Sequence, residues 1–282
     1  MLCIRRLPFI SLFTASLIAG PALAAPGPAG DSLDLTVAAD SLAFQYREFD
    51  ADGRELNRED GTLPGIRLTA RGAGRRLFAR ADLSFHDGDV DYDGETQRGA
   101  PFRTDTDTRL VSASVELGGW IGSRPGRWGT YLRLARCAWE RDIQGRGNVQ
   151  GLFEEYRWTE VGGGVRRVWP QAGTTGWRHE LSATGFTVVD GEVDVALSRL
   201  QGSDLDDTTL DLGSEFGLRF RYTAIRPLAN GLRLWIEPYY EYWEFGRSNT
   251  RPITSNGMAT GGAVTEPRSE SQRLGLAVGL AF

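Results

Sequence analysis

Lysine is absent from this chain of 282 residues, in which all 32 basic residues are arginine. Histidine and cysteine are scarce, with two of each, so the sequence offers neither an imidazole-rich metal site nor a framework of disulfides. The basic residues are outnumbered by 37 acidic ones, and the formal net charge of -5 argues against nucleic acid as a partner. Aromatic residues make up 10% of the chain, which is too many for a disordered protein.

Long apolar runs are missing after the first two dozen residues. Residues 1–24 combine two arginines with a short apolar stretch and end on Ala-Leu-Ala, which is typical of a cleavable signal peptide. The apolar stretch is shorter than the roughly 20 residues that a membrane-spanning helix needs. The sequence therefore predicts a signal peptide over 1–24, a short leader over 25–32 and a single domain over 33–282.

The rest of the chain alternates apolar residues with polar or small ones, in segments separated by Gly, Pro, Asp and Asn. This period of two predicts β-strands with one apolar face and one polar face. In the last segment the apolar face holds Leu274, Leu276, Val278, Leu280 and Phe282. In a soluble β-sandwich such a face packs against a second sheet, whereas in a transmembrane barrel it faces lipid.

Three features favour the barrel over the sandwich. Glycine lies beside Arg, Glu and Tyr on the polar faces, which suits a crowded lumen because a missing side chain leaves room for a neighbour's long one. Tryptophans flank two short turns, at 120 and 128 and at 169 and 177, as expected of an aromatic girdle at a membrane interface. The chain also stops on Phe282, at the end of an alternating strand.

A terminal amphipathic strand that ends in Phe282 resembles the assembly signal of Gram-negative outer-membrane β-barrel proteins. With a signal peptide at the other end, the resemblance covers the whole mature chain. It implies an all-β fold, a single antiparallel up-and-down transmembrane β-barrel, with both termini in the periplasm and the long loops outside the cell. The implied partners are outer-membrane lipid, lipopolysaccharide and the barrel-assembly machinery, which would bind the C-terminal strand. We expect a monomer that binds no nucleic acid.

Ten segments fit this architecture, and an even number returns both termini to one side of the membrane. The expected strands are Leu33–Phe49, Leu63–Gly72, Arg76–Val90, Thr108–Trp120, Trp128–Ile143, Phe153–Val168, Trp177–Val189, Thr208–Arg226, Gly231–Phe245 and Ser269–Phe282. Eight or twelve strands remain open because of residues 186–206, where Asp190-Gly191 is typical of a tight hairpin. An extra strand would break the even count, so we interpret Glu192–Leu200 as a strand extension above the membrane.

The polar faces of these strands carry charges of both signs. The residues expected to form a charge ladder in the lumen are Arg67, Arg71, Arg80, Glu116, Glu160, Glu180, Asp211, Glu215, Arg219, Arg221, Arg233, Glu237, Glu241 and Arg273. Arginine binds carboxylates bidentately, and charges withdrawn from water need partners, so the pattern predicts a narrow lumen held closed by ion pairs. A structural role, passage of small solutes, surface binding and adhesion are the functions consistent with such a barrel.

Asp82, Ser84 and His86 place an acid, a hydroxyl and an imidazole on one strand face. These are the groups of nucleophilic catalysis, but side chains on a straight strand run parallel and do not converge. The alternative function is an outer-membrane hydrolase that acts on a peptide or a lipid at the extracellular rim.

Asp89, Asp91 and Asp93, followed by Gly94, resemble the start of a calcium-binding loop, in which alternate carboxylates converge on a hard cation. The twelfth position of such a loop holds Ala100 in place of the bidentate Glu, so half of the pattern is missing. We expect no resident cofactor, with Ca²⁺ or Mg²⁺ gathered at the acidic external loops as the alternative.

Omptin-type outer-membrane proteases also combine ten strands with carboxylates at the rim, and Asp91-x-Asp93 is similar to their paired acids. The resemblance implies an Asp-x-His pair as well, which this sequence lacks. Ser84-Phe85 precedes His86, and the other histidine, His179, lies near a periplasmic turn. The sequence therefore does not favour a protease.

Overall fold

The structure is a computed structural model that describes residues 32–96, 99–122, 127–169 and 176–282. The expected signal peptide and nearly all of the expected leader lie outside these ranges, as do parts of the expected turns at 121–127 and 169–176. Among the described residues, no helix has the length and the hydropathy that crossing a bilayer requires.

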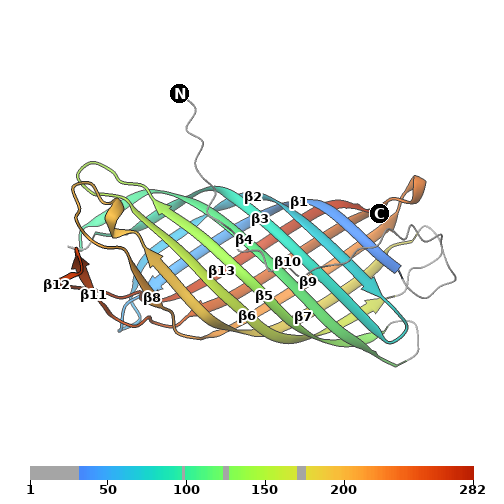
Figure 1. Ribbon diagram of the computed structural model, residues 1–282. Coiled ribbons are helices and arrows are strands. Elements are labelled where there is room, and N and C mark those ends of the chain that lie inside the picture. The colour runs from blue at the N-terminus through green and yellow to red at the C-terminus, as the bar shows by residue number, and fades with distance from the viewer. Residues whose placement is uncertain (1–31, 97–98, 123–126, 170–175) are drawn as a thin grey trace. The chain divides into compact units, whose positions relative to one another are not determined.

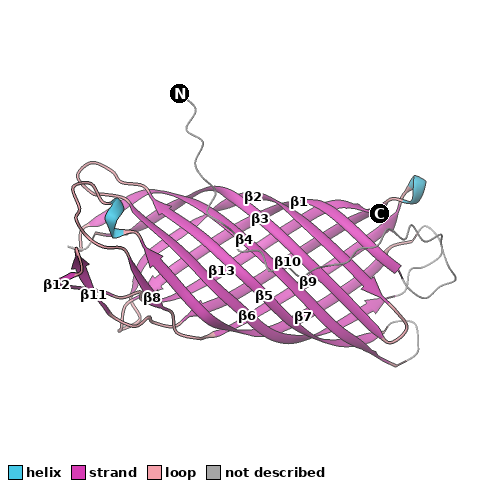
Figure 2. Ribbon diagram, in the orientation of Figure 1, coloured by secondary structure: helices cyan, strands magenta, loops and turns pink. Residues whose placement is uncertain are grey.

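Ten antiparallel strands close into a barrel (Figure 1 and Figure 2), so the predicted fold class is confirmed. They are β1 (Ser32–Phe49), β2 (Glu55–Ala73), β3 (Leu77–Glu95), β4 (Pro101–Ile121), β5 (Trp128–Ile143), β6 (Leu152–Trp169), β7 (Arg178–Val195), the pair β8 (Thr208–Asp211) and β9 (Phe216–Pro227), β10 (Arg233–Phe245) and β13 (Arg268–Ala281). The pair counts as one strand because Asp211 faces Glu192, and Phe216 faces Thr187, in the same register on β7. The barrel closes where β1 pairs with β13.

The two ends of the barrel differ. At one end, here called the turn end, β1 begins and β13 ends (Figure 1). At the other, here called the loop end, lies a hairpin of β11 (Arg251–Ser255) and β12 (Met258–Val264). A 3₁₀ turn at Leu197–Arg199 also lies at the loop end, and a second at Ala229–Gly231 connects β9 to β10.

At the loop end the strands are longer than predicted. The expected loops at Asp50–Thr62 and Asp91–Asp107 are mostly strand, because β2, β3 and β4 keep pairing beyond the apolar alternation. Asp93, for example, faces Arg58 on one side and Arg103 on the other. The prediction is wrong here because it relied on apolar alternation, which these segments lack. Charged residues on the exposed faces of neighbouring strands stabilise the pairing instead, through cross-strand ion pairs. A transmembrane strand needs about 9–11 residues, and β3 has 19.

β7 passes through Asp190-Gly191 and continues to Val195, so no hairpin forms there and the expected strand extension is confirmed as far as Val195. Beyond it, Leu197–Arg199 form a 3₁₀ turn and not a strand. β7 has one more residue than β6 in this region, which forms a bulge. At the bulge the register between β7 and β6 shifts, and Asp190 adopts a left-handed φ of 50°. The bulge exchanges the two faces of the strand. Val188 faces inward on the turn-end side of the bulge, and odd-numbered Val193 faces inward on the other side.

The outward face of the barrel carries an apolar band. Its exposed side chains come from β1 to β7, β9 and β13 and include Leu35, Val37, Ile66, Leu68, Leu83, Phe85, Val115, Leu117, Leu132, Leu134, Val161, Val165, Leu181, Phe220, Tyr222, Leu274, Leu276, Val278 and Leu280. In a sandwich this face would be buried, whereas here the strands form one closed sheet with the apolar face outside. Exposed apolar surface of this extent is typical of a barrel that contacts lipid.

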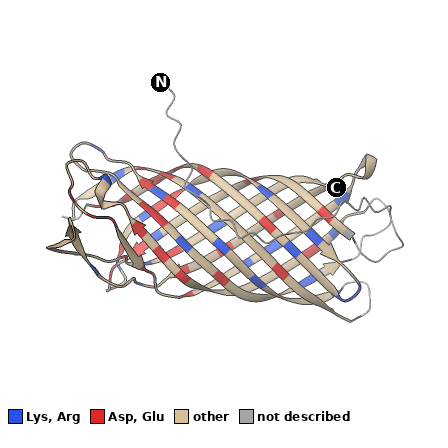
Figure 3. Ribbon diagram, viewed as in Figure 1, with Lys and Arg blue, Asp and Glu red and all other residues tan. Residues whose placement is uncertain are grey.

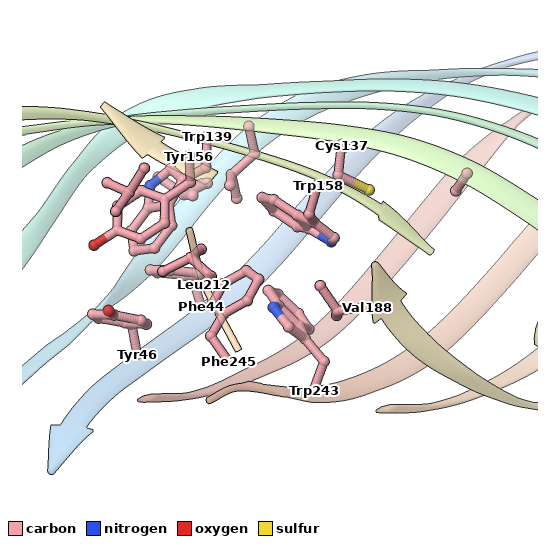
Figure 4. Close-up of a cluster of buried hydrophobic side chains, with 14 of the residues drawn as sticks. Phe44, Tyr46, Cys137, Trp139, Tyr156, Trp158, Val188, Leu212, Trp243 and Phe245 are labelled. Atoms are coloured by element: carbon pink, nitrogen blue, oxygen red, sulfur yellow. The ribbon is translucent and has the colours of Figure 1, made fainter. Parts of the chain in front are cut away.

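Aromatic side chains fill the lumen toward the loop end (Figure 4). This group, here called the aromatic core, consists of Phe44, Tyr46, Trp139, Tyr156, Trp158, Trp243 and Phe245. Trp139 stacks on Tyr156 with ring centroids 4.8 Å apart, and Trp158 stacks on Trp243 at 5.9 Å. Because these rings come from β1, β5, β6 and β10, the aromatic core spans the lumen from wall to wall.

Inward glycines make room for aromatic rings on neighbouring strands, as predicted. Gly275 faces Tyr239 across β13 and β10, and a Cβ atom on Gly275 would lie 2.0 Å from Cζ of that ring. Gly217 has the same relation to Phe186, with 2.3 Å between the added Cβ and the ring. Any side chain at these two positions would overlap the ring beside it.

The tryptophans near the turn end do not all face outward. Trp128 is 47% exposed, and Arg167 lies over both Trp128 and Trp169, 5.0 Å from each ring centroid. Trp120 shares the inward face of β4 with Glu116 instead, and packs against Phe78 with centroids 4.4 Å apart. The predicted girdle therefore includes Trp128 and excludes Trp120.

Candidate functional site

The lumen between the aromatic core and the turn end is filled with charged side chains, and Figure 3 shows both signs interleaved along the strands. Of the residues expected in the charge ladder, the structure places all but Asp211 and Glu215 inside the barrel. The inward members are Arg67, Arg71, Arg80, Glu116, Glu160, Glu180, Arg219, Arg221, Arg233, Glu237, Glu241 and Arg273.

Arg80 of β3 connects opposite walls of the barrel. Its two terminal nitrogens donate to the two carboxylate oxygens of Glu237 on β10, each at 2.8 Å, and its Nε donates to Asp82 at 2.7 Å. Arg67 Nε donates to Asp40 at 2.9 Å, and its Nη1 donates to Glu237 at 3.3 Å. Since β2, β1 and β13 separate β3 from β10 around the wall, the bonds between Arg80 and Glu237 cross the lumen, whereas Arg67 and Asp40 lie on the adjacent strands β2 and β1.

Arg221 of β9 makes a second crossing. It pairs with Glu116 of β4, and its Nη1 donates to Asp82 of β3 at 3.4 Å. Arg166 Nη2 donates to Glu116 at 2.6 Å, while its Nε lies 2.9 Å from Glu180. Each carboxylate thus faces a guanidinium, which offsets the cost of removing both charges from water.

A third set of pairs involves Arg219, whose Nε donates to Glu241 at 2.6 Å. Its Nη2 lies 3.6 Å from Glu160, which also accepts a hydrogen bond from Arg133. Neither Arg133 nor several other members of the network, among them Asp34, Asp40 and Arg166, stood out in the sequence. Inward and outward residues alternate along each strand, so this alternation would have placed them inside the barrel.

A cavity of about 30 Å³ remains among these pairs. It is lined by Leu42, Arg67, Asp82, Ser84, His86, Ser112, Ser114, Arg133, Arg219, Arg221, Tyr239, Glu241 and Arg273. Its wall therefore carries five arginines and two carboxylates. Other carboxylates of the network, such as Glu116 and Glu237, pair with the arginines from outside the cavity wall.

Asp211 and Glu215 lie outside the lumen, and their predicted inward placement is wrong. Both are exposed, and Asp211 accepts a hydrogen bond from Asn249 at 2.5 Å and pairs with Arg251 at 3.3 Å. The irregular residues between β8 and β9 exchange the two strand faces, just as the neighbouring bulge at Asp190 does on β7. A strict period of two therefore assigns the wrong face to residues on the loop-end side of the irregularity.

Asp82, Ser84 and His86 all border the cavity, but the structure does not join them into a catalytic arrangement. Asp82 binds the guanidinium groups described above, and the hydroxyl of Ser84 lies 2.8 Å from that of Ser112. His86 Nε2 lies 3.3 Å from Asp40. Nucleophilic catalysis needs the hydroxyl and its base in contact, whereas here each group has a different partner.

Asp89, Asp91 and Asp93 lie on the outward face of β3 near the loop end, where all three are exposed. An extended strand holds such carboxylates apart, so they do not converge as a calcium loop requires. Within the described part of the chain, no group of three or more His, Cys, Asp or Glu side chains is arranged to hold a metal ion. Binding of Ca²⁺ or Mg²⁺ at the acidic external residues stays a prediction.

A buried group of acids at the loop end was not predicted. This group, here called the carboxylate cluster, consists of Glu48, Glu59, Glu154 and Glu266 around Arg141. Arg141 Nη1 lies 2.9 Å from Glu48 and 2.7 Å from Glu154, and its Nε donates to Glu59 at 2.7 Å. The alternation on β1 and β6 would have placed Glu48 and Glu154 inside, but Glu59 falls in an expected loop.

Glu266 closes the carboxylate cluster from the loop that leads into β13, and it is 5% exposed. Its carboxylate accepts hydrogen bonds from Tyr156 at 2.7 Å and from Tyr46 at 3.1 Å. Burial, together with the charges of Glu48 and Glu154, raises the pKa of Glu266 well above its usual value. Folding therefore favours the protonated form of this side chain.

Asp206 joins two of the connections at the loop end. Its carboxylate accepts hydrogen bonds from the hydroxyl of Thr254 at 2.7 Å and from the backbone N–H of Gly257 at 2.9 Å. These bonds lower the pKa of Asp206, because they stabilise the ionised carboxylate. The β11–β12 hairpin is thereby fixed to the segment that precedes β8.

The pairing of acids with histidine that the omptin resemblance implies does not form. Asp91 and Asp93 face outward from β3 and not into the rim of the barrel. His86 is buried in the lumen, and His179 stacks on Tyr222 near the turn end, with ring centroids 5.8 Å apart.

No protein-family model matches the chain, and no curated protein matches it. Among solved structures, it is similar to the outer-membrane protease OmpT from Escherichia coli, with 10% identity over 90% of this chain and 97% of that chain, and a TM-score of 0.57. The outer-membrane protein OprG from Pseudomonas aeruginosa has 10% identity over 89% of this chain and 94% of that one, with a TM-score of 0.37. The translocator domain of the autotransporter NalP from Neisseria meningitidis has 11% identity over 89% and 88%, with a TM-score of 0.39.

The likeness to OmpT is one of fold and not of activity, given the low identity. The chain thus has the closed β-barrel fold of Gram-negative outer-membrane proteins.

Proposed function

We propose that this protein is a monomeric barrel of the Gram-negative outer membrane whose lumen is closed by its own side chains. Its turn end and both termini would lie in the periplasm, and its loop end outside the cell. The role that fits this arrangement is structural or surface binding, and not passage of solutes. The observation that carries the proposal is the set of ion pairs that cross the lumen between Arg80 and Glu237 and between Arg221 and Glu116.

Two successive layers support a closed lumen. The ion pairs occupy the part nearer the turn end, where Arg80 and Glu237 are 1% and 0% exposed. The aromatic core occupies the part nearer the loop end, where Trp158 and Trp243 are each 1% exposed. A solute would have to separate both layers, while open aqueous channels are found in barrels of sixteen or more strands.

The outer surface supports the proposed membrane location. The apolar band would contact the acyl chains, and the charged outward residues of the strand extensions would reach the lipopolysaccharide region. Arg109, for example, is exposed and pairs with Asp87 at 2.8 Å and with Glu140 at 3.0 Å. Arg side chains on such a surface are suited to bind phosphate groups. Phe282 is 56% exposed, where the assembly machinery would reach it.

Conductance in planar bilayers tests the closed lumen. We expect the folded barrel, identified by its heat-modifiable migration on gels, to insert without producing current steps. A large porin reconstituted in the same way serves as the positive control. Steady single-channel steps from the wild-type chain would overturn the proposal.

The hydrolase alternative is not favoured, because Ser84 is bonded to Ser112 and His86 lies beside Asp40 within the lumen. We expect the wild-type barrel and His86→Ala to be equally inactive on a peptide library and on extracted outer-membrane lipid. Turnover by the wild type that is lost in His86→Ala would establish the enzyme.

A further inference from the structure

We propose that the cavity inside the barrel is a binding site for one small inorganic anion of halide size. The site lies between the cross-lumen ion pairs and the aromatic core, and its main ligands are the guanidinium groups of Arg133 and Arg273. It is independent of the proposed role of the loop end, because it would be occupied whether or not the barrel binds a partner outside.

The first support is a set of buried donors without an acceptor. Arg133 and Arg273 are 3% and 9% exposed, and both line the cavity. Nε of Arg133, and both Nε and Nη2 of Arg273, donate to no side chain or backbone oxygen in the described part of the chain. A buried N–H that lacks an acceptor destabilises the folded state, and more so when the group is charged. An anion in the cavity would remove this cost.

The second support is the position of Arg273. Its closest carboxylate contact joins Nη1 to Glu241 Oε2 at 3.8 Å, beyond the distance of a hydrogen bond. Its guanidinium carbon lies 4.2 Å from the ring centroid of Trp243 and 5.9 Å from that of Phe44. The aromatic core therefore holds the cation on one side, and Nε and Nη2 of Arg273 are left without a hydrogen-bond partner among the described residues.

The third support is the sign of the charge on the cavity wall. Five arginines and only two carboxylates line it. The carboxylates that balance Arg133 and Arg221, namely Glu160 and Glu116, do not line the cavity. A ligand in the cavity thus meets guanidinium groups first, which favours an anion over a cation.

The size of the cavity restricts the anion. About 10–15 Å³ is needed for one water molecule, so a cavity of about 30 Å³ holds a halide with one water. A small anion therefore fits this space better than phosphate or an organic acid does. The hydroxyls of Ser84 and Ser112 also line the cavity and would complete the ligand set.

Crystals of the mature chain grown in bromide in place of chloride provide the direct test. Data collected at the bromine absorption edge should show an anomalous peak inside the cavity, within hydrogen-bonding reach of Arg133 and Arg273. Bromide found only on the outer surface, with water alone in the cavity, would overturn the proposal.

A second measurement follows unfolding in detergent by heat-modifiable migration, with chloride compared against gluconate at equal ionic strength. At a chloride concentration ten times its Kd, the ratio of folded to unfolded chain should rise about elevenfold over gluconate. Arg273→Gln, which removes the cation and two unpaired donors, should abolish this difference. Arg268→Gln is the matched control, because Arg268 faces outward and pairs with Glu244 and Glu270.

If Arg273→Gln does not fold, Arg273→Lys keeps the charge and removes the planar fork, and it should weaken the chloride effect. Should neither variant fold, the bromide map of the wild type decides alone. Equal unfolding of the wild type in chloride and gluconate, at all concentrations, would contradict the proposal.

Discussion

At the residue scale, the lumen depends on chemistry that only arginine provides. Arg80 binds both oxygens of Glu237 through two nitrogens and Asp82 through a third. A lysine ammonium is a point charge and does not match a carboxylate in this planar way. The absence of lysine from the chain agrees with an interior in which guanidinium groups bind the carboxylates, as Arg80 binds Glu237 across the lumen.

The carboxylate cluster predicts a pH dependence of stability to which Glu266 contributes. The pKa of Glu266 is raised in the folded barrel, so its contribution to stability is fully present below about pH 4.5, the usual range of a glutamate. That contribution is lost as the pH rises through the raised value, because the ionised carboxylate must lie near Glu48 and Glu154. Glu266→Gln should therefore resist alkaline unfolding better than the wild type, measured by the heat-modifiable fraction between pH 5 and pH 9.

The control for this variant is Glu270→Gln, since Glu270 lies on the outward face and pairs with Arg47 at 2.9 Å and with Arg268 at 3.1 Å. Its pH profile should follow that of the wild type. An unchanged alkaline loss in Glu266→Gln would show that another group controls the transition.

At the scale of strands, the glycines that face rings predict which substitutions the wall tolerates. Gly275→Ala would place a methyl group 2.0 Å from Cζ of Tyr239 and displace the ring, whose hydroxyl donates to Asp40 at 3.1 Å. We expect a loss of about 1–3 kcal/mol, as is typical of overpacking. Equilibrium unfolding in urea, in detergent or lipid, measures it.

Gly185→Ala is the matched control, because Gly185 also lies in a barrel strand but has no atom within 4 Å of an added Cβ. It should unfold at the same urea concentration as the wild type, or slightly higher. Equal stability of Gly275→Ala and Gly185→Ala would mean that the Tyr239 ring moves without cost.

The strands also show how far the sequence determines the structure. Trp128–Ile143 is predicted to the residue, because its alternation is unbroken from end to end. Asp211 and Glu215 are misplaced because a bulge exchanges the faces without changing the composition. The carboxylate cluster escapes prediction because it needs Glu59, which lies in a stretch too polar to suggest a strand, to meet Arg141 across the lumen. The cavity depends on distances between opposite walls of the barrel, and the alternation of residues along a strand does not predict these distances.

At the scale of the whole molecule, the exposed apolar band distinguishes a membrane barrel from a soluble one. Leu132 is 74% exposed on the outward face of β5. In water, Leu132→Arg would cost little, whereas in the middle of a bilayer an arginine on the lipid face costs about 2–4 kcal/mol. We expect a loss in that range when the barrel is unfolded reversibly from lipid vesicles.

Met258→Arg provides the comparison, since Met258 is 72% exposed but lies on β12 of the loop-end hairpin, away from the apolar band. Its effect should stay within about 0.5 kcal/mol of zero. If Leu132→Arg changed the free energy of unfolding as little as Met258→Arg, the apolar band would not face lipid. That result would contradict the proposed location in the outer membrane.

The seam between β1 and β13 has a consequence for biosynthesis. Thr36 pairs with Ala281, so the wall closes only when β13 pairs with both β1 and β10. Without β13 the sheet would have two bare edges, and bare edges invite pairing with other chains. A chain truncated before β13 would lack the strand that pairs with both β1 and β10. We expect such a chain to be degraded by proteases and not to form a smaller barrel.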